Sequence, residues 1–134
     1  MALAFPVLLL MLLLAAEVGR AYFMATQLSN AAREGALWAA HNASKETSAA
    51  QLDTDTKTVI AGEERTSASI LVCPTQVVTI TRTNNTIVYP TPTSGQSSDE
   101  QISVTCTYNT LVHIRPIPST LTIGTKVSTF LVVP

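Results

Sequence analysis

The first forty residues combine an apolar run with a helical repeat. The run extends from Ala2 to Ala16, and Glu17 and Arg20 follow it. The pattern predicts one helix from near Pro6 to about His41, which would be roughly 50–55 Å long and would project from a small domain. Its apolar and small residues recur at steps of three and four, the period of an α-helix: Leu14, Val18, Ala21, Ala25, Leu28, Ala32, Ala36 and Ala39.

A second helix is predicted between Lys45 and Glu64, with Ser44 as its N-terminal cap. From Ser67 onward the pattern changes to alternation with β-branched residues, which is typical of strands. Five segments fit this pattern: Ser69 to Cys73, Gln76 to Thr83, Thr86 to Tyr89, Ile102 to Ile114 and Leu121 to Val133.

The connections between these strands also carry a signal. Asn84-Asn85 suits a tight hairpin, because asparagine tolerates a positive φ. Pro90 to Glu100 is a Thr/Ser/Pro/Gly-rich segment, and we expect it to be a surface loop. The final strand is long and apolar for an edge, so it either lies inside its own sheet or pairs with a neighbouring subunit.

One face of the fourth predicted strand is apolar. Ile102, Val104, Cys106 and Tyr108 share it, so we expect this face to pack on the helices. In the second strand, either Val77 and Thr79 or Val78 and Ile80 face the same way. The sequence therefore predicts an α+β fold with a long protruding N-terminal helix, a short second helix and an antiparallel sheet. We divide it into a helix, residues 1–43, and a head, residues 44–134.

Composition narrows the class of protein. The net charge is −1, charged residues make up 13% of the chain, and no Lys/Arg cluster is present, so nothing indicates nucleic-acid binding. Low charge with abundant Thr and Ser suits an extracellular or envelope protein. Cys73 and Cys106 then pair as a disulfide or remain two buried thiols.

No catalytic motif is found. The sequence has no Gly-rich phosphate loop, nucleophile elbow or HExxH motif, and His41 and His113 are far apart. Asp53, Asp55 and Glu64 have the spacing of three calcium-loop positions, but lysine and threonine stand where a ligand and a glycine are needed. We expect a protein that is not an enzyme and that has no cofactor or metal.

The apolar run has three readings. A cleaved export signal would need a positively charged start, and no Lys or Arg precedes Arg20. A membrane span needs about 20 apolar residues, which makes the run marginal. The third reading is a helix of the pilin type, held in the membrane first and then packed in the core of a filament.

Three stretches carry a family resemblance: Phe5 to Leu10, Glu17 to Tyr22 and Gln27 to Ala36. They resemble the N-terminal signature of TadE-like pseudopilins, the minor pilins of the tight-adherence pilus in the type IV pilus superfamily. The asparagine-alanine-alanine-arginine-glutamate-glycine stretch is the most specific part. The family's processing glycine and the glutamate after it are not found before the apolar run, so the resemblance transfers no processing site.

The resemblance implies a structural subunit of an extracellular pilus filament, minor or major, that assembles by bundling of N-terminal helices. Its partners would be copies of itself or other pilins, and before assembly the cytoplasmic (inner) membrane and the pilus assembly machinery. The bundle interface would comprise Leu9, Leu10, Leu13, Leu14, Glu17, Arg20, Ala25, Leu28, Ala32 and Ala36. Small residues, including Gly19, Gly35 and Ala39, would allow close approach of neighbouring helices.

Two other functions are compatible with the pattern. The chain could be a membrane-anchored or secreted β-rich adhesion module whose apolar run is only an anchor or signal, or an inactive subunit of an envelope secretion complex. The helical stripe from Ala21 to Ala40 separates the first of these from a pilin, because a signal alone would not need it. Asn42 and Asn84 each begin a glycosylation sequon.

Overall fold

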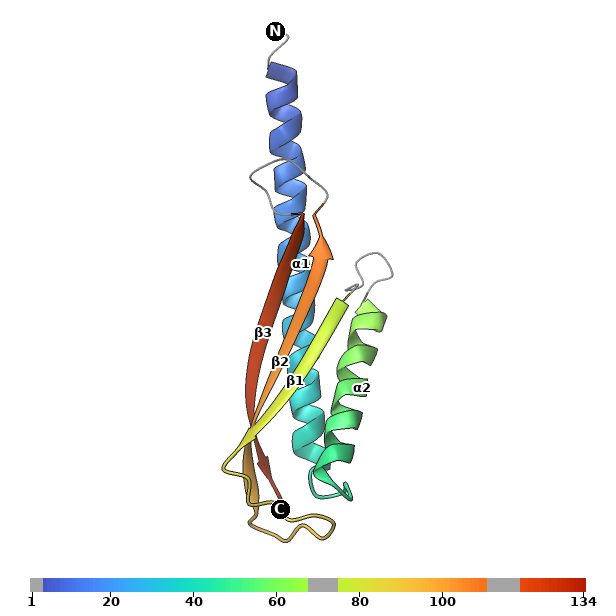
Figure 1. Cartoon of the computed structure of the whole chain (residues 1–134), viewed down its shortest axis with the longest axis vertical. Helices are drawn as coiled ribbons and strands as arrows, with labels where there is room; N and C mark the ends of the chain where they lie inside the picture. Colours follow the sequence, from blue (N-terminus) through green and yellow to red (C-terminus); the bar gives the residue numbers. More distant parts are fainter. Residues whose placement is uncertain (1–3, 68–74, 111–118) are drawn as a thin grey trace.

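The chain forms a rod with a head at one end (Figure 1). This computed structural model describes residues 4–67, 75–110 and 119–134. The elements are α1 (Ala4–Asn42), α2 (Ala49–Ser67), β1 (Thr75–Thr83), β2 (Ser97–Asn109) and β3 (Thr120–Val132). The predicted α+β class is confirmed, with a long N-terminal helix, a short second helix and an antiparallel sheet in the order β1-β2-β3.

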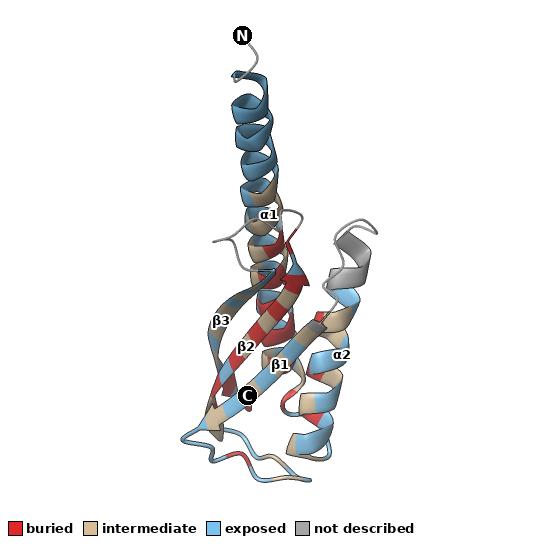
Figure 2. Cartoon of the chain, turned by 45° about the horizontal axis from the view of Figure 1, so that its top comes forward, coloured by how far each residue is buried: buried red, intermediate tan, exposed pale blue. Residues whose placement is uncertain are grey.

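The long helix is confirmed to within two residues of its predicted ends. Its 39 residues correspond to about 58 Å. Pro6 lies in its first turn, where a missing N–H removes no intrahelical hydrogen bond. From Met24 downward one side of α1 is buried in the head, whereas residues 4–16 are exposed on all sides (Figure 2).

The second helix begins later than predicted. Ser48 is its cap, since Ser48 Oγ accepts a hydrogen bond from the backbone N–H of Gln51 at 3.1 Å. The predicted cap, Ser44, lies instead in the turn that follows α1. That turn is closed by N–H groups of Lys45 and Glu46, which donate to the carbonyl of Asn42.

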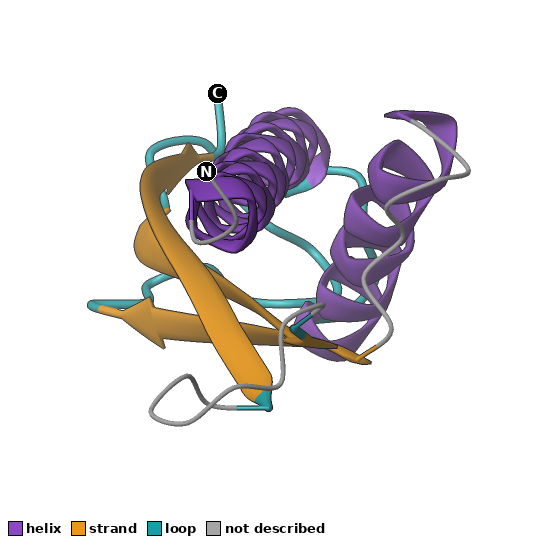
Figure 3. Cartoon of the chain, turned by 90° about the horizontal axis from the view of Figure 1, so that it is seen from above, coloured by secondary structure: helices purple, strands orange, loops and turns teal. Residues whose placement is uncertain are grey.

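The sheet and the two helices form two layers. Seen along the rod, α1 and α2 lie side by side on one face of the sheet (Figure 3). The face predicted for Ile102, Val104, Cys106 and Tyr108 is confirmed, and all four side chains are buried. Of the two alternatives for the inner face of β1, the structure shows Val78 and Ile80, which pack against this core. Val77 is exposed.

Two strand predictions need correction. Thr86 to Tyr89 is not a strand, because side chains bind its backbone: Asn85 Oδ1 accepts from the Ile87 N–H, and Gln96 Oε1 accepts from the Val88 N–H. Asn84 has the expected positive φ of 52°, but it opens a long connection rather than a two-residue hairpin.

The fourth strand starts at Ser97, so the predicted surface loop ends earlier than Glu100. Ser98 and Glu100 lie on the buried face of β2, which a reading of apolar alternation could not reveal. The strand predicted at Ser69 to Cys73 and the end of the one at Ile102 to Ile114 fall outside the described residues. The last strand, β3, is confirmed to within one residue and lies at an edge of the described sheet.

The lower part of α1 belongs to the core of the head. One buried cluster joins Leu28, Ala32 and Ala36 to Ile60 of α2 and to β2. A second cluster joins Ala39 to Leu52, Ile87 and Leu131. The division into residues 1–43 and 44–134 remains a prediction, but the helix packs within the head well before residue 43.

Candidate functional site

The exposed surface of α1 is the candidate site. Its upper part carries nine large apolar side chains that the described chain leaves open, with exposed fractions from 38% to 73%. Soluble monomers rarely expose a contiguous apolar surface of this size. The nine are Phe5, Val7, Leu8, Leu9, Leu10, Met11, Leu12, Leu13 and Leu14.

The open surface continues downward as a stripe on the side of α1 that faces away from the head. Val18, Tyr22 and Leu37 belong to it, with exposed fractions of 68%, 76% and 56%. Arg33 and Glu34 are also exposed here. We call these five residues, together with the apolar segment above them, the outer stripe. The sequence predictions missed Val18, Tyr22 and Leu37, because helical periodicity does not say which side the head will cover.

The ten residues predicted for a bundle interface divide into three groups. Leu9, Leu10, Leu13 and Leu14 are exposed, as that role requires. Glu17, Arg20 and Ala25 are half-buried. Leu28, Ala32 and Ala36 are at most 4% exposed because they pack on the chain's own sheet and α2, so in this fold they are covered by the head.

Arg20 is held by the head. Its guanidinium lies over the Tyr108 ring, 4.8 Å from the ring centre, which is a cation–π contact. Arg20 Nη1 also donates to the backbone carbonyl of Asn109 at 3.4 Å. Burial raises the pKa of the Tyr108 phenol, and the Glu17 carboxylate raises it further while Arg20 lowers it. The charged pair after the apolar run thus turns toward the sheet, and the outer stripe stays apolar at that level.

Gly35 allows α1 and α2 to approach closely. A Cβ at this position would lie 2.4 Å from Cγ1 and 2.7 Å from Cδ1 of Ile60, far inside van der Waals contact. The small residues expected to serve contacts between subunits, Ala32, Gly35, Ala36 and Ala39, therefore serve packing within this chain. Gly19 differs, since no described residue lies within 4 Å of a Cβ added there.

A buried charge cluster links α2 to the sheet, and the sequence predictions missed it. Arg82 Nη2 forms ion pairs with Asp53 Oδ1 and with Glu100 Oε2, the latter at 2.8 Å. The Glu100 side chain is fully buried. Burial raises the pKa of Glu100, the charge and hydrogen bond of Arg82 lower it, and Asp53 raises it.

The remaining predicted positions are placed as follows. Cys106, the one cysteine among the described residues, is buried in the core and is not a free thiol. Cys73 lies outside the described residues, so its pairing with Cys106 stays a prediction. Asn42 Nδ2 donates to the Trp38 carbonyl, and Asn84 Nδ2 donates to Asp99 Oδ2. Glycosylation of either asparagine also stays a prediction.

These features define a class: a β-sheet head on a long helix whose free end is apolar and, by length and composition, able to cross a membrane. The model of the family described as TadE-like protein matches residues 1–37, which confirms the resemblance for that part of the chain. No curated protein and no solved structure matches the chain. The match supports a structural, pilus-related protein, and with the apolar helix it fits a membrane-anchored one that assembles with other pilus components.

Proposed function

We propose that this chain is a structural subunit of an extracellular pilus filament, assembled by bundling of N-terminal helices with copies of itself or with other pilins. The observation that carries the proposal is the bare apolar end of α1, residues 4–16. Burying one such side chain fully stabilises by about 1.5–3 kcal/mol, so covering this segment is worth on the order of 10 kcal/mol. Such a surface needs either lipid or other helices around it.

The length of the outer stripe is compatible with a membrane first and a bundle of helices afterwards. Residues 4–16 extend about 20 Å, which is short of the roughly 30 Å of membrane hydrocarbon. Val18 and Tyr22 lengthen the outward apolar surface to nearly that thickness, because Glu17 and Arg20 are turned toward the head. The cytoplasmic membrane can thus hold the helix before the pilus assembly machinery transfers the subunit to the filament.

The lower half of the outer stripe favours a bundle over a simple anchor. A helix that served only as an anchor or export signal would not need to continue through the whole head. Here α1 runs unbroken to Asn42, with one side in the core and Leu37 exposed on the other. In the filament, this open side would face the axis, and the sheet would face outward at the cell surface.

The test is electron microscopy of material sheared from cells, with mass spectrometry of the N-terminal peptide. We expect filaments that contain this chain with its apolar segment intact. Leu13→Asp should abolish its incorporation, because an unpaired charge would be buried in the bundle. Thr79→Asp, on the exposed outer face of β1, is the matched control and should incorporate normally.

Two results would overturn the proposal. One is a soluble monomer whose chain begins near Glu17, which would favour a secreted adhesion module. The other is normal incorporation of the Leu13→Asp variant into filaments.

A further inference from the structure

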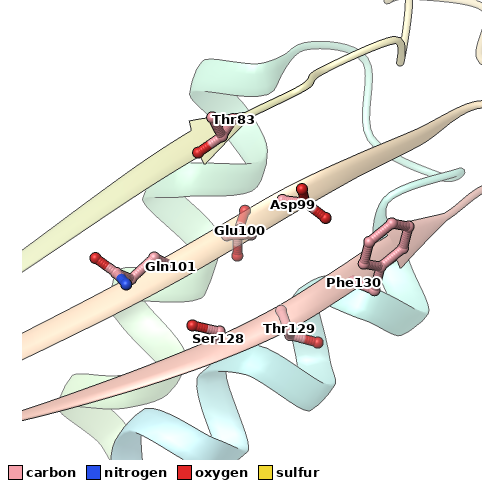
Figure 4. A pocket seen from close by; sticks show the side chains of 7 residues that line it. All are labelled: Thr83, Asp99, Glu100, Gln101, Ser128, Thr129 and Phe130. Atoms are coloured by element: carbon pink, nitrogen blue, oxygen red, sulfur yellow. The ribbon is translucent and has the colours of Figure 1, made fainter.

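A hollow lies on the face of the sheet that points away from the helices. Its volume is about 490 Å³, within the range of small-molecule sites. It lies over two cross-strand rows: Thr83, Asp99 and Phe130 are opposite one another in the first, and Gln101 and Ser128 are opposite in the second. These five side chains come from all three described strands, and the intervening residues Glu100 and Thr129 complete the lining (Figure 4).

The polar groups in the hollow are open, unlike those at the other end of the same face. There, the Thr107 and Thr122 hydroxyls bond each other at 3.0 Å, and Thr105 Oγ1 donates to a backbone carbonyl. In the hollow, the Gln101 amide and the Ser128 hydroxyl make no hydrogen bond with the part of the chain that the structure describes. These groups can therefore bind a ligand without breaking existing bonds.

Asp99 is oriented but only partly satisfied. Asn84 Nδ2 donates to Asp99 Oδ2 at 3.1 Å, which fixes the carboxylate. The second oxygen, Oδ1, has no hydrogen-bond donor among the described residues. It is thus a preorganised acceptor, and its negative charge disfavours acidic ligands.

Phe130 adds an apolar surface next to this acceptor. Its side chain is 62% exposed, and it is the one aromatic residue among the described residues of the outer sheet face. The phenylalanine ring forms no hydrogen bonds with water. A ligand with an apolar face would therefore be stabilised by packing against this ring.

We propose that this hollow binds a neutral sugar in its pyranose form. The C–H face of such a ring matches Phe130, its neighbouring hydroxyls can donate to Asp99 Oδ1, and further hydroxyls can bond to Gln101 and Ser128. This activity goes beyond the filament role and does not require it, since binding can be measured on the unassembled full chain.

The experiment is saturation-transfer NMR on the full chain in detergent micelles. The probes are methyl glycosides of glucose, galactose, mannose and N-acetylglucosamine. We expect at least one to bind with a millimolar Kd. Phe130→Ser and Asp99→Asn should weaken that binding roughly tenfold or more, since each removes a main contact. Val77→Ser is the matched control, because Val77 is 55% exposed at the far end of the same face.

Circular dichroism shows whether each variant folds. If a hollow variant does not fold, Gln101→Ala, a change at an exposed position, takes its place in the binding measurement. The proposal is overturned if none of the four sugars gives saturable transfer in the wild type. It is also overturned if the folded hollow variants bind as the wild type does, or if Val77→Ser weakens binding equally. The hollow could instead mediate self-association of the chain. Self-association that is lost in Phe130→Ser, in a protein that binds none of the sugars, would also contradict the proposal.

Discussion

At Gly35 the two helices come so close that one methyl group has no room between them. The nearest obstacle, Ile60 Cγ1, is bonded directly to Cβ in a β-branched, fully buried side chain, so it cannot move away freely. The residue is therefore fixed by packing within the head. This assigns a role to the glycine of the most specific part of the family signature.

Gly35→Ala should destabilise the fold by about 1–3 kcal/mol, because it overpacks the contact between α1 and α2. Urea unfolding of the detergent-solubilised chain, followed by circular dichroism, measures this change. Gly62→Ala is the control: a Cβ there meets no atom of the described residues within 4 Å, so it should be neutral or stabilise α2 by up to about 1 kcal/mol.

A double-mutant cycle with Ile60→Ala extends this test. The two changes together should destabilise less than the sum of each alone, because the alanine at 60 makes room for the new methyl group. Strict additivity would show that the contact between Gly35 and Ile60 does not limit the approach of the helices.

Glu100 should make stability depend on pH. Burial raises its folded-state pKa above the ordinary value of 4.5, so the folded chain binds the proton more tightly than the unfolded chain. The wild type should therefore gain stability, relative to Glu100→Gln, as the pH falls from 7 toward 4.5. Unfolding midpoints of both proteins across this range measure the difference.

Glu34→Gln, at an exposed carboxyl, is the control for this pH series and should follow the wild type. At pH 7 the Glu100→Gln variant should be at least as stable as the wild type, since it removes a buried charge while Arg82 keeps Asp53. A wild type that instead loses stability relative to Glu100→Gln on acidification would contradict the raised pKa.

At the scale of elements, α2 is joined to α1 and to the sheet by apolar packing, and to β1 also by charge. Leu52 and Ile60 contribute to the two apolar clusters, whereas Asp53 reaches Arg82 on β1. The ion pairs thus fix α2 relative to β1, and the described residues of this cluster are one guanidinium and two carboxyl groups.

Replacing Arg82 by methionine should destabilise the head by about 3–5 kcal/mol, because two carboxylates lose their only described cation. Lys126→Met, at an exposed position on β3, should change stability little. Chemical denaturation of the two variants gives the comparison. Equal, small effects would mean that Arg82 is not needed to balance the buried charge.

The elements that could be predicted from sequence are those whose pattern reports burial directly. Periodicity predicted α1, and alternation predicted β1, β3 and the buried face of β2. It failed where polar side chains decide the structure. Asn85 and Gln96 bind the backbone that alternation assigned to a strand. Glu100 lies in the core because Arg82 accompanies it, and no local pattern shows that pairing.

At the scale of the whole molecule, the candidate site could be predicted only in part. The apolar run predicted the exposed leucines at 9, 10, 13 and 14. The side of the helix covered by the head depends on contacts with distant strands, such as that between Arg20 and Tyr108. Leu28, Ala32 and Ala36, predicted at the bundle interface, pack within the head, and the outer stripe is seen only in the folded arrangement.

The central claim is that the bare end of α1 packs against helices of other subunits. A photo-crosslinking amino acid at position 13, irradiated in sheared filaments, tests it most directly, with position 81 on the outer sheet face of β1 as the control. The account predicts covalent adducts between pilin helices from position 13 and none from position 81. Filaments that contain the position-13 variant but yield no adduct between subunits would contradict it.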